Sequence, residues 1–490
     1  MRHRARLVFL VLAVLAVAPP SALASSAAIP IHVTRGLDLV SGPVFAGDAV
    51  AFGRPTEGGY EVVVRRGAQA AIARVAVPGL EGAYRTYVFA RLEASSKRFA
   101  LGLAAWRCDS RALCDEEVNR RLYRATLTGD LAGGRLTIVD GCTSEAQCRA
   151  KQCLGRPELD VSGDAVAFVA CSGGIGVRDL APGANPSARS YPDPAWGPRL
   201  AGDFVASEDT TGANAVLISV RNWRSGQDAY SVEADYPTTI AADHPTYDLQ
   251  ADGKVFYPPT TDGHAWASPS EPFEHTVDTD PLFTTRARIA SDRGAYATDI
   301  DASPLDVPGS RFVVRDLNDP PPPDAPNEAP ALATSEDTHA VGSMDFDGSR
   351  LAWIVRVCRH KWISVWDLAD QRPPALPRVP CPIPSAVSGS ARVDQQHRFH
   401  VTLECPASPD VGCVGLVAAK EPSGASWRRY SIPAGATQTK QLSSSAPCRD
   451  SSGRARAKLL FSRGYYHGEP PVVKTTTVTV HGATGSLRRC

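Results

Sequence analysis

The chain has 490 residues, of which 43% are hydrophobic and 21% are charged, so it is long and apolar enough for two or three folded domains. Lys plus Arg equals Asp plus Glu, 52 against 52, which argues against nucleic acid or an anionic membrane surface as the partner. Gly and Pro each number 40, so turns are frequent and long helices are not expected.

Residues 1–24 predict a signal peptide. Three arginines in the first six residues precede an apolar run from Leu7 to Ala18, and Ala22-Leu23-Ala24 follows as a small-residue cleavage site. The run has 12 residues, too few to cross a hydrocarbon layer of about 30 Å. No later stretch predicts a membrane span. We therefore expect cleavage near Ala24 and a secreted or otherwise extracytoplasmic protein.

Seven segments then repeat one pattern, in which a polar or Gly-containing turn is followed by an alternating strand, a variable loop and a second strand. They begin at Gly42, Phe89, Leu159, Pro198, Tyr247, Ala287 and Met344. In "DAVAFVA", residues 164–170, both faces of the strand are apolar, so both must be covered. Each segment has room for about four strands, and sheets packed face to face in a ring form a propeller.

The expected fold class is therefore all-β, with a β-propeller over residues 25–385. Seven blades are favoured, and six or eight are the alternatives. The segment "IPIHVTRGLDLV" from Ile29 could supply the outer strand of the last blade and close the ring. The proline-rich stretch "DLNDPPPPDAPNEAPALATSEDT" from Asp316 interrupts the sixth segment, either as a surface insertion or as the linker before the seventh blade.

Two of these segments, "DFDGSRLAWI…KWISVWDL" and "LQADGKVFY", resemble the TolB-like and WD-type propeller repeat. The resemblance covers about residues 30–385 and implies a toroid of six to eight blades. Such proteins are commonly extracytoplasmic in bacteria, and most are binding platforms rather than catalysts. The motif is structural, so we expect Asp179, Asp316 and Asp367 to close turns after a blade strand.

The 12 cysteines are even in number and locally spaced, which favours disulfides over metal ligands in an exported protein. Cys153 and Cys171 flank the turn at Gly163, so an antiparallel hairpin would bring them together. Pairing by proximity along the chain gives six bonds, which are Cys108–Cys114, Cys142–Cys148, Cys153–Cys171, Cys358–Cys381, Cys405–Cys413 and Cys448–Cys490. The pairing of Cys358, Cys381, Cys448 and Cys490 stays open at this point.

Residues 386–490 predict a small antiparallel β-sandwich of the Ig-like kind. In "RFHVTLEC", Phe399, Val401 and Leu403 alternate with polar residues, as in a strand with one wet face. Further strands are expected in "WRRYSIPAG", "RARAKLLFSRG" and "VVKTTTVTVHG". The stretch "LECPASPDVGCVGLV" is interpreted as a hairpin, and it resembles the C-terminal sandwich modules of secreted actinobacterial proteins.

Candidate sites are few. The GxSxG, HExxH, P-loop and GxGxxG patterns do not occur in the sequence, so it indicates no catalytic residues and no cofactor. "DIDASPLD" is a weak calcium candidate through Asp299, Asp301, Ser303 and Asp306, although the Gly and the distant Glu of a calcium loop are missing. Trp353, Trp362 and Trp366 are expected in a blade core rather than on a sugar-binding surface.

Two functions follow. The first is a secreted, non-enzymatic binding or scaffold protein whose propeller is a platform for a protein, peptide or glycan in the cell envelope or outside the cell. The alternative is a secreted carbohydrate-active hydrolase or lyase with carboxylates at the propeller channel. A third hypothesis is that a calcium ion stabilises the fold.

Overall fold

The fold is described from a computed structural model of the chain. Described are residues 26–31, 40–56, 58–77, 86–107, 120–151, 153, 156–184, 189–191, 196–210, 215–235, 247–258, 264–278, 284–300, 309–318, 331–337, 340–358, 360–375, 381–395, 398–407, 412–421, 424–425, 427–443, 455–463 and 472–482. The predicted signal peptide, Cys108, Cys114, Cys448 and Cys490 lie outside them.

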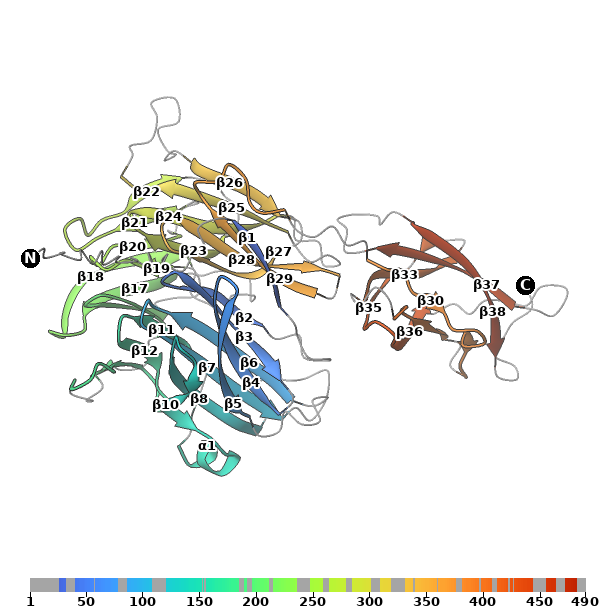
Figure 1. The fold of residues 1–490 in the computed structure, drawn as a ribbon, viewed down its shortest axis with the longest axis horizontal. Helices are drawn as coiled ribbons and strands as arrows, with labels where there is room; N and C mark the ends of the chain where they lie inside the picture. The colour runs from blue at the N-terminus through green and yellow to red at the C-terminus, as the bar shows by residue number, and fades with distance from the viewer. Residues whose placement is uncertain are drawn as a thin grey trace, which may run out of the picture.

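Seven antiparallel sheets of four main strands each form the larger part of the molecule (Figure 1). The strands of blades 1 to 3, from the innermost outward, are β2 (Ser41–Ala46), β3 (Ala49–Thr56), β4 (Gly59–Arg66) and β5 (Gln69–Ala76); β6 (Thr86–Ala94), β7 (Arg98–Arg107), β8 (Arg120–Asp130) and β10 (Thr137–Cys142); and β11 (Leu159–Ser162), β12 (Ala165–Val169), β13 (Ile175–Asp179) and β14 (Arg189–Tyr191). A two-residue strand, β9 (Gly134–Arg135), pairs in parallel with β5 and lengthens blade 1.

Blades 4 to 7 repeat this order. Their strands are β15 (Trp196–Ala201), β16 (Phe204–Thr210), β17 (Ala215–Asn222) and β18 (Gln227–Asp235); β19 (Asp248–Leu249), β20 (Val255–Tyr257), β21 (His264–Ala267) and β22 (His275–Asp278); β23 (Thr284–Ala290), β24 (Arg293–Ile300), β25 (Gly309–Asp316) and β26 (Ala331–Asp337); and β27 (Ala340–Phe346), β28 (Arg350–Val357), β29 (His360–Asp367) and β1 (Ala27–Ile31). The proline-rich stretch starts at Asp316, the last residue of β25, and its final part, Ala331–Asp337, forms β26, so it belongs to blade 6 and is not the linker before blade 7.

The seven sheets close into a ring, because each innermost strand contacts its neighbours on both sides, β2 contacting both β6 and β27. Seven apolar clusters each join two adjacent blades, the last joining blades 7 and 1. Both faces of every sheet are thereby buried, which explains why β12 is apolar and buried throughout. The chain therefore contains a seven-bladed β-propeller, as predicted.

The N-terminal strand completes blade 7, as predicted for the segment around Ile29. β1 pairs antiparallel with β29, with Ile29 opposite Ile363, and Ile29 and Ile31 are buried. The backbone amide of Ser26 donates to Asp370 Oδ2 at 3.0 Å. Pro30, which lacks an amide proton, is tolerated because β1 is an outermost strand with one neighbour. The ring is thus closed by segments from both ends of the propeller sequence.

The repeated turn has a consistent geometry. Gly163 and Gly202 lie between the first and second strands of their blades with φ of 56° and 57°, where glycine has no steric penalty. After the third strand, Asp179, Asp316 and Asp367 each accept a hydrogen bond from the amide two residues on, at 3.0 Å. These aspartates close turns, which confirms their structural interpretation.

Neighbouring turns also bond to one another across blades. Lys97 of blade 2 pairs with Asp164 of blade 3 at 2.7 Å, and Lys254 of blade 5 pairs with Asp292 of blade 6 at 2.6 Å. Arg350 of blade 7 donates to the carbonyl of Gly47 in blade 1 at 2.7 Å. On the face that carries these turns, such bonds therefore join blades 2 and 3, 5 and 6, and 7 and 1.

Among the described cysteines, four predicted disulfides are present, Cys142–Cys148, Cys153–Cys171, Cys358–Cys381 and Cys405–Cys413. The first joins the end of β10 to α1 (Glu145–Lys151), a helix that the sequence patterns did not predict. Trp353 and Trp366 are buried in the cluster between blades 6 and 7, as expected, whereas Trp362 is half-buried.

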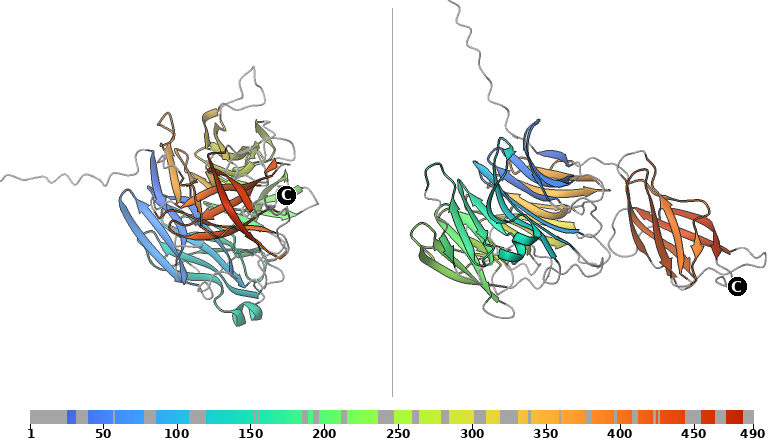
Figure 2. Two further views of the ribbon diagram at one scale, coloured as in Figure 1. Left: turned by 90° about the vertical axis from the view of Figure 1, so that its right-hand side faces the viewer. Right: turned by 90° about the horizontal axis from the view of Figure 1, so that it is seen from below.

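The C-terminal strands form a body of their own (Figure 2) around one apolar core. They are β30 (Ser385–Ala386), β31 (Arg392–Val393), β32 (Phe399–Glu404), β33 (Cys413–Glu421), β34 (Gly424–Ala425), β35 (Arg428–Ile432), β36 (Thr437–Ser443), β37 (Ala455–Arg463) and β38 (Lys474–Gly482). The hairpin predicted around Cys405 and Cys413 is wrong. β32 pairs with β30, β31 and β36, whereas β33 pairs with β34, β35 and β37. The disulfide therefore links Cys405, the residue after β32, to the start of β33, and these two strands do not pair. The short loop between two strands suggested a hairpin, but each strand finds other partners.

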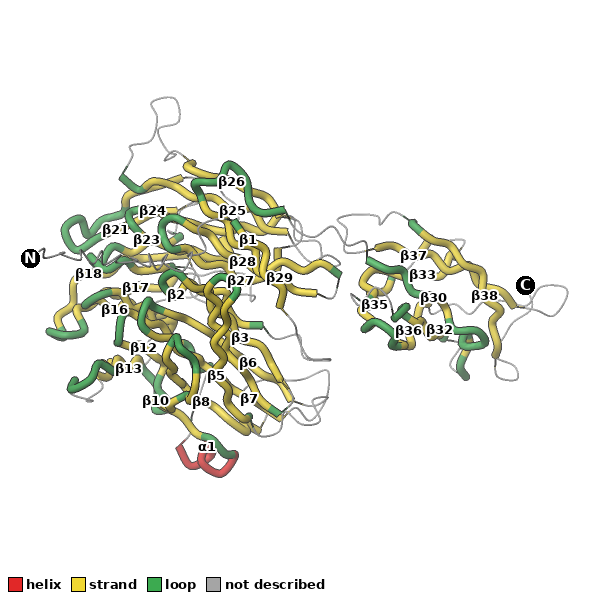
Figure 3. The backbone as a smooth tube through the Cα atoms, viewed as in Figure 1, coloured by secondary structure: helices red, strands yellow, loops and turns green. Residues whose placement is uncertain are grey.

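Strands dominate the described chain (Figure 3). Among the described residues, no helix has the length and apolar character that a membrane crossing requires.

Candidate functional site

The candidate site lies at the propeller axis and is built from one position in the innermost strands. The position is defined by the pairing of the first and second strands of each blade. In six blades its partner on the second strand is an alanine, and in blade 5 the partner is Phe256. Its residues, from blade 1 to blade 7, are Val44, Glu93, Asp160, Arg199, Asp248, Arg288 and Asp345. Directly opposed residues share a face, so the small alanine leaves room for the long charged side chain. We call the six charged residues the axial ring.

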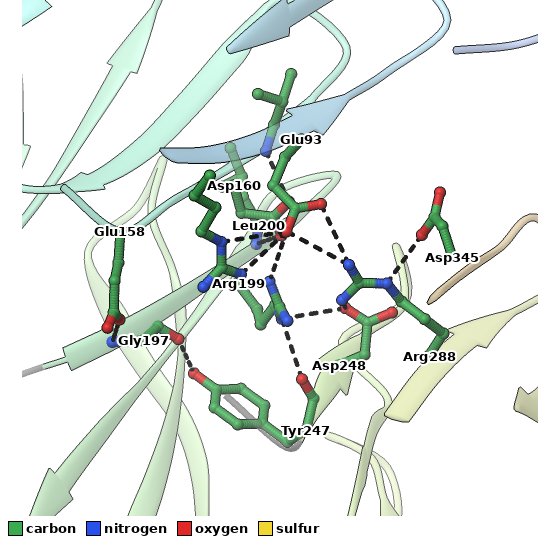
Figure 4. A network of polar contacts seen from close by, with 12 residues as sticks. Glu93, Glu158, Asp160, Gly197, Arg199, Leu200, Tyr247, Asp248, Arg288 and Asp345 are labelled. Carbon is green, nitrogen blue, oxygen red and sulfur yellow. Dashed lines mark hydrogen bonds and ion pairs between the residues drawn. The ribbon is translucent and has the colours of Figure 1, made fainter. Parts of the chain in front are cut away.

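Glu93 is the centre of this ring, and three arginines converge on it (Figure 4). Glu93 Oε1 lies 3.0 Å from Arg91 Nη2 and 3.4 Å from Arg199 Nη1, and Glu93 Oε2 lies 3.3 Å from Arg288 Nη2. Arg91 stands two residues before Glu93 on the same strand, and only 1% of it is exposed. Burial opposes ionisation of Glu93, but the guanidinium groups outweigh it and lower the pKa of Glu93 to about 2.

The aspartates of the ring reach from each blade to the next. Asp160 Oδ2 accepts the amide of Leu200 at 2.7 Å. Asp248 Oδ2 accepts the amide of Ile289 at 3.0 Å, and Asp345 Oδ2 accepts the amide of Phe45 at 2.6 Å. These three bonds join blades 3 and 4, blades 5 and 6, and blades 7 and 1, respectively. The axial ring therefore connects innermost strands of neighbouring blades.

The arginines continue these connections. Arg199 Nε donates to the carbonyl of Tyr247 at 3.0 Å, and Arg288 Nε donates to Asp345 Oδ1 at 2.8 Å. Tyr247 in turn donates its hydroxyl to the carbonyl of Gly197 at 2.6 Å. Figure 4 shows this web crossing the axis from several blades.

Three carboxyl groups at the axis hold protons more tightly than usual. Burial raises the pKa of Asp160 to about 7, with the charge of Glu93 as the next cause, and burial also raises the pKa of Asp345 to about 6. Burial and then Glu158 raise the pKa of Glu208, on β16, to about 8. The axis gathers six carboxyl groups but three guanidinium groups, so part of the acid stays neutral near pH 7.

Chemically, this arrangement combines an ionised carboxylate with neutral carboxylic acids in a buried setting. Such a combination can support acid–base work, or it can hold seven sheets together. Most of its polar groups are already engaged with each other or with backbone amides, which favours the second role. Where the chain is described, no cluster of three or more His, Cys, Asp or Glu residues is arranged to hold a metal ion.

The sequence-predicted calcium candidate is only partly described. Asp299 lies near the end of β24, with its backbone opposite Ser310. Asp301, Ser303 and Asp306 lie outside the described residues, so calcium binding there remains a prediction.

Sequence reasoning missed the axial ring, because Glu93 and Arg288 are 195 positions apart and each looks like an ordinary polar residue in a strand. The signal was nevertheless present. Aligning "LDVSGD", "PRLAGD", "YDLQADG", "ARIASD" and "MDFDG" at their turns places Asp160, Arg199, Asp248, Arg288 and Asp345 in one column.

No protein-family model and no curated protein matches this chain. Among solved structures, it is similar to the β-propeller domain of the Trilobed protease from Pyrococcus furiosus, with 10% identity, a TM-score of 0.41, and coverage of 68% of this chain and 99% of that one. It is also similar to the acylaminoacyl peptidase of Pyrococcus horikoshii (9% identity, TM-score 0.41, covering 75% and 57%) and to TolB from Acinetobacter baumannii (10%, 0.34, covering 59% and 78%). The blade count and the site rest on the strand pairing and contacts given above.

Proposed function

We propose that the protein is an exported, non-enzymatic binding or scaffold protein of the TolB-like propeller kind, acting in the cell envelope or outside the cell. The four disulfides support an oxidising compartment, since such bonds are rare in reducing cytoplasm. The predicted leader over residues 1–24 is in keeping with that compartment. The partner is a protein, peptide or glycan.

The observation that carries this proposal is the axial ring. Its carboxylates are bonded to arginines and to the amides of neighbouring blades, which makes the axis a structural fastening rather than an open reaction centre. A rigid ring of this kind suits a platform, because loops on a fixed frame lose little entropy on binding. The C-terminal body, which we propose to be an Ig-like sandwich, would then be a spacer or docking module.

The test is retention of a partner by the full chain. The immobilised native protein is incubated with envelope extract and culture fluid, and retained molecules are identified by mass spectrometry. The matched control is the same protein immobilised after unfolding in urea. We expect a protein, peptide or glycan on the native protein alone. Equal retention on both would contradict the proposal.

A second candidate is a carbohydrate-active hydrolase or lyase, favoured by the spread of pKa values at the axis. An ionised Glu93 near a protonated Asp160 is the kind of pairing that glycoside hydrolysis uses, and Glu208 is a second protonated carboxyl group. A panel of polysaccharides assayed for reducing ends, with Asp160→Asn and Glu208→Gln as variants, separates the two functions. Turnover that either variant abolishes, while Asp48→Asn leaves it intact, would favour the enzyme.

A further inference from the structure

Phe273 is the most exposed large apolar side chain among the described residues, at 58%. It lies in the loop 268–274 between β21 and β22 of blade 5. A single exposed apolar residue is common on protein surfaces and needs no special explanation. What draws attention to Phe273 is that its exposed ring lies against another aromatic ring.

A column of stacked groups supports the Phe273 ring. Its centroid lies 4.7 Å from that of His275, which stacks on Trp266 at 4.0 Å and 8° between planes. On the indole ring sits Lys254 Nζ, 4.6 Å from the centroid, and the same ammonium pairs with Asp292 Oδ1 at 2.6 Å. We call these four residues, Phe273, His275, Trp266 and Lys254, the blade-5 column. Through these contacts the exposed Phe273 ring is connected to residues of β21 and β22 and to the turn before β20 in blade 5.

The loop that carries Phe273 is itself ordered by internal bonds. The amide of Ser268 donates to the carbonyl of Glu271 at 3.0 Å, and the amide of Glu271 donates back to the carbonyl of Ser268 at 3.1 Å. Pro269 and Pro272 restrict the backbone further. Little conformational freedom remains to be lost when a partner covers the ring, which is what a binding anchor requires.

The charge around the ring is acidic. Glu271 and Glu274 flank Phe273 in sequence and are exposed, and Glu271 Oε2 lies 2.9 Å from His275 Nε2. Asp252, whose Oδ1 accepts the Lys254 amide, and Asp292 add two carboxylates beside the column. Against these four carboxylates the column offers one ammonium group, Lys254. The patch therefore complements a positive partner.

We propose that the blade-5 column and its two flanking glutamates dock an arginine- or lysine-bearing segment of a partner protein, an inference that rests on the binding function proposed above. An arginine side chain can lie on the free face of Phe273 while its guanidinium group pairs with Glu271 or Glu274. Such contacts combine stacking with charge, so the interaction weakens as salt is raised.

The probe is a fluorescent peptide of alternating arginine and glycine, titrated with the full chain and followed by anisotropy at low and high salt. The control peptide has citrulline in place of arginine, which keeps the shape and removes the charge. We expect Phe273→Ala to weaken binding of the arginine peptide about five- to ten-fold. Glu271→Gln with Glu274→Gln should weaken it and flatten its salt dependence. Leu332→Ala, which truncates another exposed apolar residue (45%), is the matched control and should change nothing.

Equal binding of the two peptides, or equal binding by wild type and Phe273→Ala, would overturn the proposal. Binding of cello- or chito-oligosaccharides that depends on Phe273, without binding of the arginine peptide, would overturn it in favour of a glycan site. The partner-retention experiment distinguishes failure of this docking surface from failure of the proposed binding function. If Phe273→Ala retains the same partners as wild type, the docking surface is wrong and the binding function stands. If wild type retains nothing beyond the unfolded control, the function itself fails.

Discussion

Removing the charge of Glu93 tests the structural role of the axial ring most sharply. Glu93→Gln keeps the size of the side chain but leaves Arg91, Arg199 and Arg288 around a neutral amide. Arg91 and Arg199 are each 1% exposed, so water cannot replace the lost partner. Breaking a buried ion pair from one side costs about 3–5 kcal/mol, because the remaining charge stays uncompensated. Arg199 keeps Asp248 and Arg288 keeps Asp345 as ion-pair partners, so this cost arises at Arg91.

The assay is urea unfolding at pH 7 followed by tryptophan fluorescence, since seven of the eight tryptophans precede residue 385. The matched control is Asp48→Asn, which breaks the Asp48–Arg66 pair, whose side chains are 41% and 44% exposed. Exposed pairs are worth less than about 1 kcal/mol. If Glu93→Gln lowers the free energy of unfolding no more than Asp48→Asn does, the ring does not hold the blades together.

Two further predictions concern pH and the disulfides. Because the folded-state pKa values of Asp160 and Glu208 are raised to about 7 and about 8, both prefer to stay protonated in the fold, and stability should fall as pH rises from about 5 to 8. Melting temperatures measured at pH 5 and pH 8 check this prediction. Asp160→Asn should reduce the dependence of the melting temperature on pH. A wild-type melting temperature that stays constant or rises with pH would contradict the prediction. Replacing Cys153 and Cys171 by Ser opens a loop of 18 residues and should cost about 3 kcal/mol in the same urea assay. A loss under about 1 kcal/mol would show that the native contacts around Cys171 suffice without the bond.

Local pattern was enough to predict much of the fold. The turn with Gly163, the strand covered on both faces and the aspartates at 179, 316 and 367 are set by residues close in sequence, and each was interpreted correctly. The proximity of Cys358 to Cys381 along the chain likewise gave the right pair.

Features that depend on distant residues were harder to predict. β32 and β33 are adjacent in sequence but pair with other strands, although both contribute buried residues to the one C-terminal core. The axial ring needs six blades to be placed in register before Glu93 meets Arg199 and Arg288. Neither arrangement can be recognised from a short stretch of sequence. Aligning the repeated turns does place five residues of the axial ring in one column.

The N-terminal strand, β1, completes blade 7, and the apolar packing between blades 7 and 1 depends on it, because Ile29 and Ile31 belong to the cluster that joins these two blades. Hydrogen–deuterium exchange of the amides in Ala27–Ile31, read by mass spectrometry on the native protein, tests it directly. Because β1 is an outermost strand, only its amides that point toward β29 can be protected, and we expect these to exchange as slowly as the amides of β29. Exchange at the rate of an unpaired peptide, while β27 to β29 remain protected, would show that blade 7 has three strands and that the propeller is not closed in this way.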